Sequence, residues 1–414
     1  MLKSDHIFRS GAILLVSLLF FLNATANVIP QGFYKAQLQL NDSTVLPFSF
    51  EVKYDAETYT VTFINGEERI STSEIAVRKD SVFIRMPVFD SEFKIRMEEG
   101  NAMTGLWINH ARKDKNVIPF RAIKVQPDGV YTKKTDSIFH ANSAYEVTFS
   151  ENSKDSYKAK GVFREWNFSY TSGTFLTETG DYRYLSGTRS GDNFSMSCFD
   201  GSHAFLFTGK VKGDSIVEGH FYSGAHWHEP WVAKRNDTFE LRDPDSLTYM
   251  KPGFTKVDFS FKNLEGKTVS LSDEKYKNKV VLIQIMGSWC PNCMDETKFL
   301  APFYDKYNRQ GLEVIGLAFE RTDDFNKAVA NVSRLKTRFN ANYDFLITMK
   351  TGAQQASDAL PMLNGIMAFP TTIYIDKKGV VRKVYTGFSG PATGHAYTKY
   401  VEDTTNFVEK LLRE

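Results

Sequence analysis

Residues 279–287, KVVLIQIMG, restrict the fold of this chain more than any other segment. The segment is apolar almost without interruption and rich in Val and Ile, which favour strands. A strand of this kind is buried on both faces, as in a sheet that helices cover on both sides. A second such segment, LEVIGLAFE at 312–320, follows a stretch with helical periodicity. The pattern indicates an α/β domain.

The remaining C-terminal segments agree with this interpretation. Residues 295–311 and 322–340 have helical periodicity, residues 370–387 have the pattern of a hairpin, and a final helix is expected at 397–414. The order strand, helix, strand, helix, hairpin, helix indicates a mixed sheet. We place this domain at 253–414.

Residues 27–240 have a different rhythm. Short segments such as 47–55 and 58–70 alternate between apolar and polar residues, and Asn65-Gly66 is a typical two-residue turn. No segment here predicts a helix of three turns. We expect a β-rich region, either a β-sandwich or a β-barrel, built as one domain or as two similar halves.

Length and charge set broad limits. A chain of 414 residues is too long for one ordinary core, so two or three domains are expected. Residues 241–252 contain Pro244 and Pro252 and are expected to be a linker. The formal net charge is only +2, so nothing in the composition calls for nucleic acid or an anionic membrane as a partner.

Residues 1–26 have the features of a secretory signal peptide. Lys3 and Arg9 precede an apolar stretch at 12–22, and Ala24-Thr25-Ala26 has the small residues of a cleavage site. The apolar stretch is shorter than the roughly 20 residues of a membrane-spanning helix. An uncleaved anchor is the alternative. We expect an exported, periplasmic protein, in a compartment where disulfides persist.

The chain has three cysteines, and two of them stand two residues apart in GSWCPNCMDE at 287–296. Cys290 and Cys293 follow the buried strand and begin a helix, where free N–H groups and the helix dipole stabilise an anion. The pKa of a thiol there is expected to fall below its free value of about 8.5. A thiolate at Cys290 could attack a disulfide, and Cys293 could resolve the product. Pro291 fits the first helical turn.

Two other interpretations of the pair are weaker. A zinc site commonly has four ligands, and Cys198, the third cysteine, lies far upstream. A structural disulfide across so short a loop would remove little chain entropy. We therefore expect a redox couple that works without a metal or organic cofactor.

A separate metal site is a weaker possibility in the β-rich region. Alternation along GAHWHEPW would place His226 and His228 on one face of a strand. His220, His203 and Glu229 are nearby in the sequence. The more ordinary interpretation is a surface or core aromatic cluster with Trp227 and Trp231.

The segments VVLIQIMGSWCPNCMDE (280–296) and AFPTTIYIDKKGVVRKVYTG (368–387) resemble the TlpA/ResA-like thiol-disulfide oxidoreductases, which have the thioredoxin fold. The resemblance covers roughly residues 253–414. It implies that Cys290 is the nucleophile, that Cys293 is the resolving thiol, and that the two form a redox-active disulfide. It also implies a cis-proline at Pro370, with the backbone of Phe369 pairing with the substrate chain like an added strand.

The resemblance also bears on three further residues. Glu296 would tune the cysteines and handle protons; a solvated helix glutamate is the alternative. Gln284 stands where cytosolic thioredoxins carry a buried aspartate, which favours the envelope branch of the family. Trp289 would shield the dithiol and contact substrate, or else simply pack.

The chain departs from a minimal thioredoxin at residues 349–370, where we expect an added helix at about 353–363 near the active-site face. Cys198 is expected to be buried and inert. The β-rich region resembles N-terminal β-domains of TlpA-like proteins from Bacteroidetes-type bacteria, which implies no activity for it.

The resulting hypothesis is a periplasmic thiol-disulfide oxidoreductase that reduces client protein disulfides and receives electrons from a membrane donor. An oxidase or isomerase of the same fold is one alternative. An envelope binding protein whose β-rich region carries the function is the other. The sequence fixes neither the client nor the oligomeric state.

Overall fold

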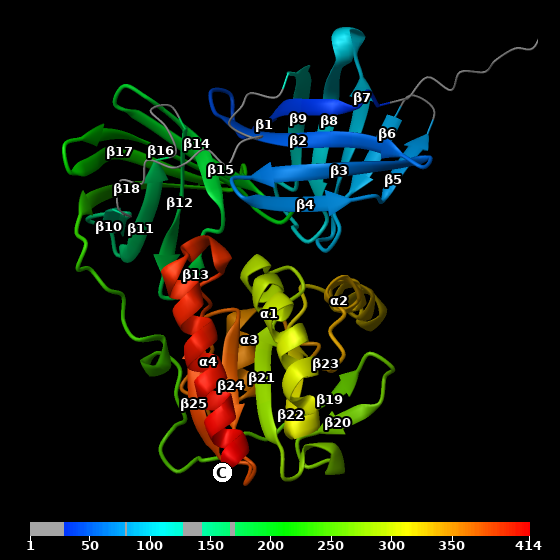
Figure 1. The fold of residues 1–414 in the computed structure, drawn as a ribbon, viewed down its shortest axis with the longest axis vertical. Helices are drawn as coiled ribbons and strands as arrows, with labels where there is room; N and C mark the ends of the chain where they lie inside the picture. The colour runs from blue at the N-terminus through cyan, green and yellow to red at the C-terminus, as the bar shows by residue number, and fades with distance from the viewer. Residues whose placement is uncertain (1–28, 79–80, 127–142, 166–169) are drawn as a thin grey trace, which may run out of the picture.

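The computed structural model describes residues 29–78, 81–126, 143–165 and 170–414. In these residues the chain forms two nine-stranded β-sheets and one seven-stranded sheet with helices (Figure 1). We call strands β1 to β18 the β region and the elements from β19 onward the α/β region. The expected signal peptide at 1–26 lies outside the described residues.

The first sheet is antiparallel and curls into a barrel-like shape. Its order is β4-β3-β2-β1-β9-β8-β7-β6-β5. The two edge strands, β4 and β5, are separated by only two residues of chain, 73–74, so the edges must approach each other. The strands are β1 (Gly32–Gln39), β2 (Val45–Asp55), β3 (Thr58–Asn65), β4 (Glu68–Thr72), β5 (Ile75–Arg78), β6 (Ser81–Arg85), β7 (Ser91–Met97), β8 (Ala102–Asn109) and β9 (Val117–Val125).

The second sheet closes into a barrel. Its order is β11-β10-β18-β17-β16-β15-β14-β12-β13, and a further pairing of the end strand β11 with β12 closes the sheet. Closure removes exposed strand edges. The strands are β10 (Ser143–Phe149), β11 (Tyr157–Glu165), β12 (Tyr170–Thr177), β13 (Gly180–Asp181), β14 (Leu185–Ser190), β15 (Asn193–Phe199), β16 (Ala204–Lys212), β17 (Ser215–Ser223) and β18 (Trp227–Arg235). The expected β-rich architecture therefore takes the barrel form.

The third sheet has the order β20-β19-β23-β22-β21-β24-β25 and is mixed. The interior strand β21 pairs parallel with β22 and antiparallel with β24. The strands are β19 (Ser260–Asn263), β20 (Thr268–Ser270), β21 (Val280–Met286), β22 (Leu312–Ala318), β23 (Asp344–Ile347), β24 (Thr371–Ile375) and β25 (Val381–Thr386). The helices are α1 (Pro291–Tyr307), α2 (Phe325–Phe339), α3 (Gly352–Ala359) and α4 (His395–Arg413).

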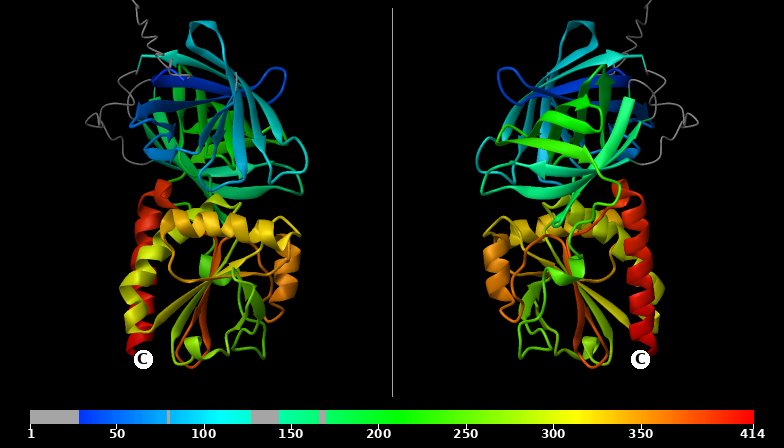
Figure 2. Two further views of the ribbon diagram at one scale, coloured as in Figure 1. Left: turned by 90° about the vertical axis from the view of Figure 1, so that its right-hand side faces the viewer. Right: turned by 90° about the vertical axis from the view of Figure 1, so that its left-hand side faces the viewer.

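Every residue of β21 is buried, because apolar side chains cover both faces of the sheet. Val280 and Leu282 pack in one hydrophobic cluster with residues of α1, α2 and α4, whereas Ile283 and Ile285 pack with residues of α3 on the other face. Figure 2 shows α3 on the opposite side of the sheet from α1 and α4. This arrangement confirms the mixed α/β sheet expected from KVVLIQIMG.

Several details differ from the sequence-based expectation. The hairpin β19–β20 and strand β23 were not anticipated, because these are short segments of three or four residues. The helix expected at 353–363 is α3 and ends at Ala359. The expected linker at 241–252 is held against the α/β region, where Thr248 is fully buried and its N–H donates to Oγ1 of Thr386 at 3.1 Å.

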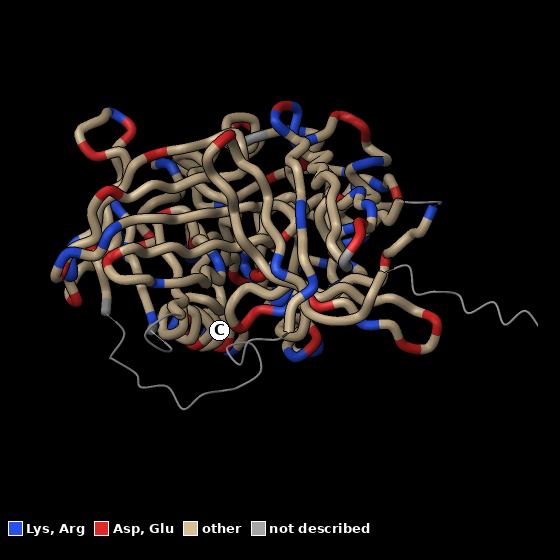
Figure 3. The backbone as a smooth tube through the Cα atoms, turned by 90° about the horizontal axis from the view of Figure 1, so that it is seen from above, with Lys and Arg blue, Asp and Glu red and all other residues tan. Residues whose placement is uncertain are grey.

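The β region lies over the end of the α/β sheet at which α1 begins (Figure 1). Acidic and basic residues are interspersed along the described backbone, without a large region of one sign (Figure 3). In the described part of the chain, none of the helices has the length and apolar character needed to cross a bilayer.

A buried arginine joins the two regions. Arg183, in the turn between β13 and β14, has no exposed side-chain surface. Its guanidinium pairs with Glu68 of the first sheet, with Asp200 of the second barrel at 3.2 Å, and with Asp295 of α1. We call these four residues the Arg183 cluster. The cluster brings together side chains from the first sheet, from the second barrel and from α1.

Substitution of Arg183 is expected to lower the stability of the protein strongly. Removing one partner of a buried ion pair costs about 3–5 kcal/mol, because the other charges stay buried without compensation. We expect Arg183→Met to lower the free energy of unfolding in urea by about this amount. The control is Arg242→Met, which removes an exposed pair with Glu178 and should change stability little. Equal effects of the two substitutions would contradict the prediction.

Candidate active site

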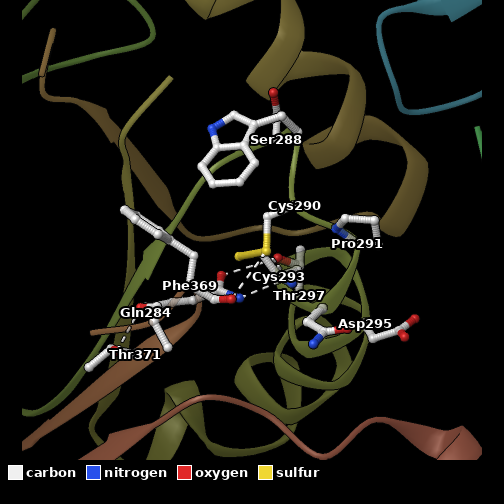
Figure 4. The surroundings of a disulfide bond; sticks show 12 residues. Gln284, Ser288, Cys290, Pro291, Cys293, Asp295, Thr297, Phe369 and Thr371 are labelled. Carbon is white, nitrogen blue, oxygen red and sulfur yellow. Dashed lines mark hydrogen bonds between the residues drawn. A yellow bond between two sulfur atoms is a disulfide. The ribbon is translucent and has the colours of Figure 1, made fainter. Parts of the chain in front are cut away.

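The two neighbouring cysteines lie where β21 gives way to α1. Cys290 is the N-cap of α1, and its Sγ accepts a hydrogen bond from the backbone N–H of Cys293 at 3.2 Å. The two form a disulfide (Figure 4). Cys290 is 6% exposed and Cys293 is fully buried. The N-terminus of a helix stabilises a thiolate, so the geometry favours Cys290 as the anion after reduction.

The strand beneath the disulfide supports the first turn of α1. Gln284 of β21 is fully buried. Its Nε2 donates to the carbonyl oxygen of Cys293 at 3.1 Å, and its Oε1 accepts from Oγ1 of Thr297 at 3.1 Å. A neutral amide therefore occupies this position, and it orients the helix.

The peptide bond between Phe369 and Pro370 is cis, as expected. The carbonyl oxygen of Phe369 lies 3.4 Å from Sγ of Cys290. The ring of Phe369 meets the indole of Trp289 edge to face, with 5.4 Å between the ring centroids. The structure thus brings the expected substrate-binding residues Trp289, Phe369 and Pro370 together around the disulfide.

The indole of Trp289 is held in place by a hydrogen bond and by a cation over its ring. Its indole N–H donates to the carbonyl oxygen of Phe319 at 2.9 Å, and the guanidinium carbon of Arg321 lies 3.6 Å from the ring centroid. A cation over an aromatic face at this distance stabilises the ring position. Trp289 is half-buried and fixed in place, so its packing role is visible in the structure, whereas contact with substrate is an inference.

Glu296 lies one turn along α1 and is fully buried, which excludes the alternative of a solvated helix glutamate. Its Oε1 accepts hydrogen bonds from Oγ1 of Thr372 at 2.7 Å and from the Tyr400 hydroxyl at 2.8 Å. Its Oε2 has no hydrogen-bond partner among the described residues. Burial raises the pKa of Glu296 to about 7, although Thr372, Tyr400 and the nearby Gln284 amide act in the opposite direction.

A second buried carboxyl holds the segment before Cys290. Glu320 accepts hydrogen bonds from the N–H of Ser288 at 2.7 Å and from its hydroxyl at 2.6 Å. Burial raises the pKa of Glu320, and the two bonds to Ser288 oppose that shift. The residue fixes the loop between β21 and α1 from the end of β22.

The β region supplies contacts that sequence reasoning did not anticipate. Oγ of Ser202 donates to the carbonyl oxygen of Trp289 at 2.9 Å. Nη1 of Arg183 donates to the carbonyl oxygen of Pro291 at 3.1 Å, between the two cysteines in sequence. Nothing local marks these residues, because each is an ordinary polar residue in a turn and its partner lies about a hundred positions away in the sequence.

The histidines considered as an alternative metal site do not converge. His228 lies against His220, with 3.0 Å between Nε2 and Nδ1, whereas His226 precedes β18. Among the residues that the structure describes, no group of three or more His, Cys, Asp or Glu side chains is placed to hold a metal ion. Trp231 is a core residue, and Trp227 is exposed.

Cys198 is fully buried in the second barrel and has no disulfide partner. Burial raises the pKa of its thiol well above the ordinary value, and the carboxylates of Asp200 and Glu68 add to this. The thiolate is the reactive form of cysteine, so this environment agrees with the expected inert role.

Known proteins resemble the α/β region. Residues 251–399 match the family model described as Redoxin. The thiol-disulfide oxidoreductase ResA of Bacillus thuringiensis subsp. konkukian (strain 97-27) is 30% identical over 158 residues, which cover 38% of this chain and 80% of the relative. ResA of Geobacillus thermodenitrificans (strain NG80-2) is 29% identical over 140 residues, which cover 34% and 72%.

A putative thiol:disulfide interchange protein DsbE from Chlorobium tepidum is 20% identical, with a TM-score of 0.31, and the match covers 40% of this chain and 99% of that one. Similarity at this level adds nothing to the assignment, which rests on the sequence relatives. By the extent and identity of its match to ResA, this chain belongs to the ResA-like thiol-disulfide oxidoreductases and is an oxidoreductase enzyme with a thioredoxin-like C-terminal region.

Proposed function

We propose that the protein is an exported, periplasmic enzyme that reduces disulfides of client proteins through Cys290 and Cys293. One observation carries this proposal: the dithiol pair stands at the N-terminus of α1, with Phe369 and the cis-proline beside it. The helix end favours a thiolate, and the backbone at Phe369 offers a place where an extended client chain could pair.

The reaction consists of two thiol–disulfide exchanges. In the reduced enzyme, the Cys290 thiolate attacks one sulfur of the client disulfide. The client S–S bond breaks, a bond between Cys290 and the client forms, and the other client sulfur leaves as a thiolate that takes up a proton. Cys293 then loses its proton and attacks Cys290, which releases the second client thiolate and forms the Cys290–Cys293 disulfide. Two electrons pass from the enzyme to the client.

Glu296 supports the second exchange in this proposal. Cys293 is fully buried and must lose a proton before it attacks. A carboxyl with a pKa of about 7 is a suitable acceptor, because it is partly ionised at neutral pH and can return the proton later. A proton-binding group near the site is also required when the enzyme is reduced again.

The expected signal peptide at 1–26 supports export, and the proposal includes a membrane electron donor that reduces the Cys290–Cys293 disulfide after each turnover. The reverse direction, as a thiol oxidase or isomerase, uses the same residues. The reduction potential of the couple distinguishes the two. A value near that of thioredoxin, about −270 mV, supports a reductase, and one near −120 mV, as in a strong oxidant, overturns that direction.

Cysteine substitutions test the mechanism. We expect Cys290→Ser to abolish reduction of insulin disulfides, since no thiolate remains to attack. Cys293→Ser should accumulate a mixed disulfide with the client, because no thiol remains to resolve it. Mass spectrometry under non-reducing conditions measures this adduct. Cys198→Ala is the matched control and should retain wild-type turnover. Reduction of insulin by Cys290→Ser at the wild-type rate would refute the assignment.

The ionisation of Glu296 has a consequence for stability. Its folded pKa of about 7 lies above its ordinary value of 4.5, so the folded state holds the proton more strongly between these pH values. Stability from this group is complete below pH ~4.5 and is lost as the pH rises to ~7. We expect the free energy of unfolding of the wild type, relative to Glu296→Gln, to fall by about 3 kcal/mol from pH 4.5 to 8.

Urea unfolding of the oxidised protein measures this difference, since the two cysteines do not titrate as a disulfide. The wild type and Glu296→Gln are compared at each pH. The contributions of the other buried acids to the free energy of unfolding are then the same in both proteins and cancel. A difference that stays constant with pH would show that Glu296 is not perturbed, and it would remove the basis for its role as a proton acceptor.

A further inference from the structure

We propose that Arg183, a residue of the β region, is a positioning residue of the redox site. It holds the first turn of α1, and its positive charge raises the reduction potential of the Cys290–Cys293 couple. The β region would then set how strongly the enzyme reduces its clients, in addition to any role in placing the enzyme. This inference rests on the proposed function only in taking the dithiol as the redox group.

The geometry is specific. Nη1 of Arg183 donates to the carbonyl oxygen of Pro291 at 3.1 Å, and the same nitrogen contacts Oδ2 of Asp295. Pro291 lies between the two cysteines, so the guanidinium touches the CPNC segment itself. In Figure 4 the side chain of Asp295 points away from the disulfide, on the outer side of the first turns of α1. The guanidinium, which contacts this carboxylate, therefore meets α1 on that outer side.

The backbone around Arg183 is built to hold this position. Arg183 has a φ of 58°, a left-handed conformation that residues other than Gly and Asn seldom adopt. Its N–H donates to Oδ1 of Asp181 at 2.6 Å, and Oδ2 of Asp181 accepts from the N–H of Gly390 at 2.6 Å. The carbonyl oxygen of Asp181 accepts from Nδ2 of Asn292 at 3.2 Å. The turn is thus tied to the first turn of α1 and to the segment that precedes α4.

The guanidinium of Arg183 carries a positive charge, although three carboxylates surround it. Burial alone would lower the pKa of Arg183, but Asp295, Glu68 and Asp200 more than offset burial, so the guanidinium stays protonated. A buried positive charge next to the N-terminal turn stabilises the Cys290 thiolate, in the same direction as the helix dipole. Stabilising the reduced form relative to the disulfide raises the reduction potential.

Asp295 opposes Arg183 at the same place. Burial raises the pKa of Asp295 to about 7, and Arg183 lowers it. Above that pH the carboxylate is ionised and neutralises part of the guanidinium charge. Removing the negative charge should therefore act on the couple in the opposite direction from removing the positive charge. A purely structural loosening of the helix predicts no such opposition.

The test measures the equilibrium of the full-length protein with reduced and oxidised glutathione at pH 8. We expect Arg183→Met to shift the equilibrium constant toward the disulfide by about tenfold, which is about 30 mV for a two-electron couple. Arg183→Lys loses the same planar fork but keeps the charge, and it should remain within about twofold of the wild type. Asp295→Asn keeps a hydrogen-bond acceptor for Arg183, and it should shift the constant toward the dithiol.

The pKa of the Cys290 thiol, followed by its rate of alkylation in the reduced protein, gives a second readout. It should rise in Arg183→Met and fall in Asp295→Asn. Should Arg183→Met fail to fold, Asp295→Asn decides alone: a shift toward the dithiol supports the proposal, and no shift or the reverse overturns it. Equal shifts in Arg183→Met and Arg183→Lys also overturn it, because they would reflect geometry rather than charge.

This experiment is separate from the test of the proposed function. The glutathione equilibrium reports the couple itself, whether or not the enzyme turns over protein disulfides. If the wild type does not reduce insulin but its reduction potential changes when Arg183 is substituted, the proposed activity is refuted and the positioning role stands. If the wild type reduces insulin normally but the reduction potential is unchanged in all three variants, the proposed activity stands and the positioning role of Arg183 is refuted.

Discussion

The arrangement of this molecule depends on one fully buried guanidinium. Arg183 meets carboxylates from the first sheet, the second barrel and α1. A buried charge is costly to remove from water, and it is stable only when its partners stay in place. Each carboxylate depends on the arginine for the same reason. The two barrels and the redox helix are therefore fixed relative to one another by a polar contact that tolerates little displacement, whereas apolar packing alone would allow more adjustment.

This contact reaches the segment between the two cysteines, where Arg183 donates to the carbonyl oxygen of Pro291. The chain leaves the buried strand β21 at the end of the sheet and enters α1 after the short loop at 287–290. The N-terminal turn of α1 thereby stands at the edge of the α/β region, where it can serve chemistry on one side and docking on the other. Cys290 lies on the side of the chemistry, and Asp295 lies on the side that docks against the β region.

The sequence was sufficient for the parts of the site that are local. The dithiol, its place after a buried strand, and the glutamate three residues beyond Cys293 all lie within one short segment. Their types and spacing carry the chemistry, and the family resemblance added Phe369 and the cis-proline. The burial of Glu296 was not accessible, because it depends on Tyr400 and Thr372, which distant elements deliver to one point.

The role of Arg183 could not be predicted from the sequence, since an arginine in a turn between two strands ordinarily faces water. Only the packing of the second barrel against α1 gives it a role. The same reasoning bears on how the redox region should be studied. Separated from the β region, Asp295 would be hydrated and ionised without its partner, and the carbonyl of Pro291 would lose its cationic donor. The isolated α/β region would then have the same redox couple with a different reduction potential, so a potential measured on it would not hold for the whole chain.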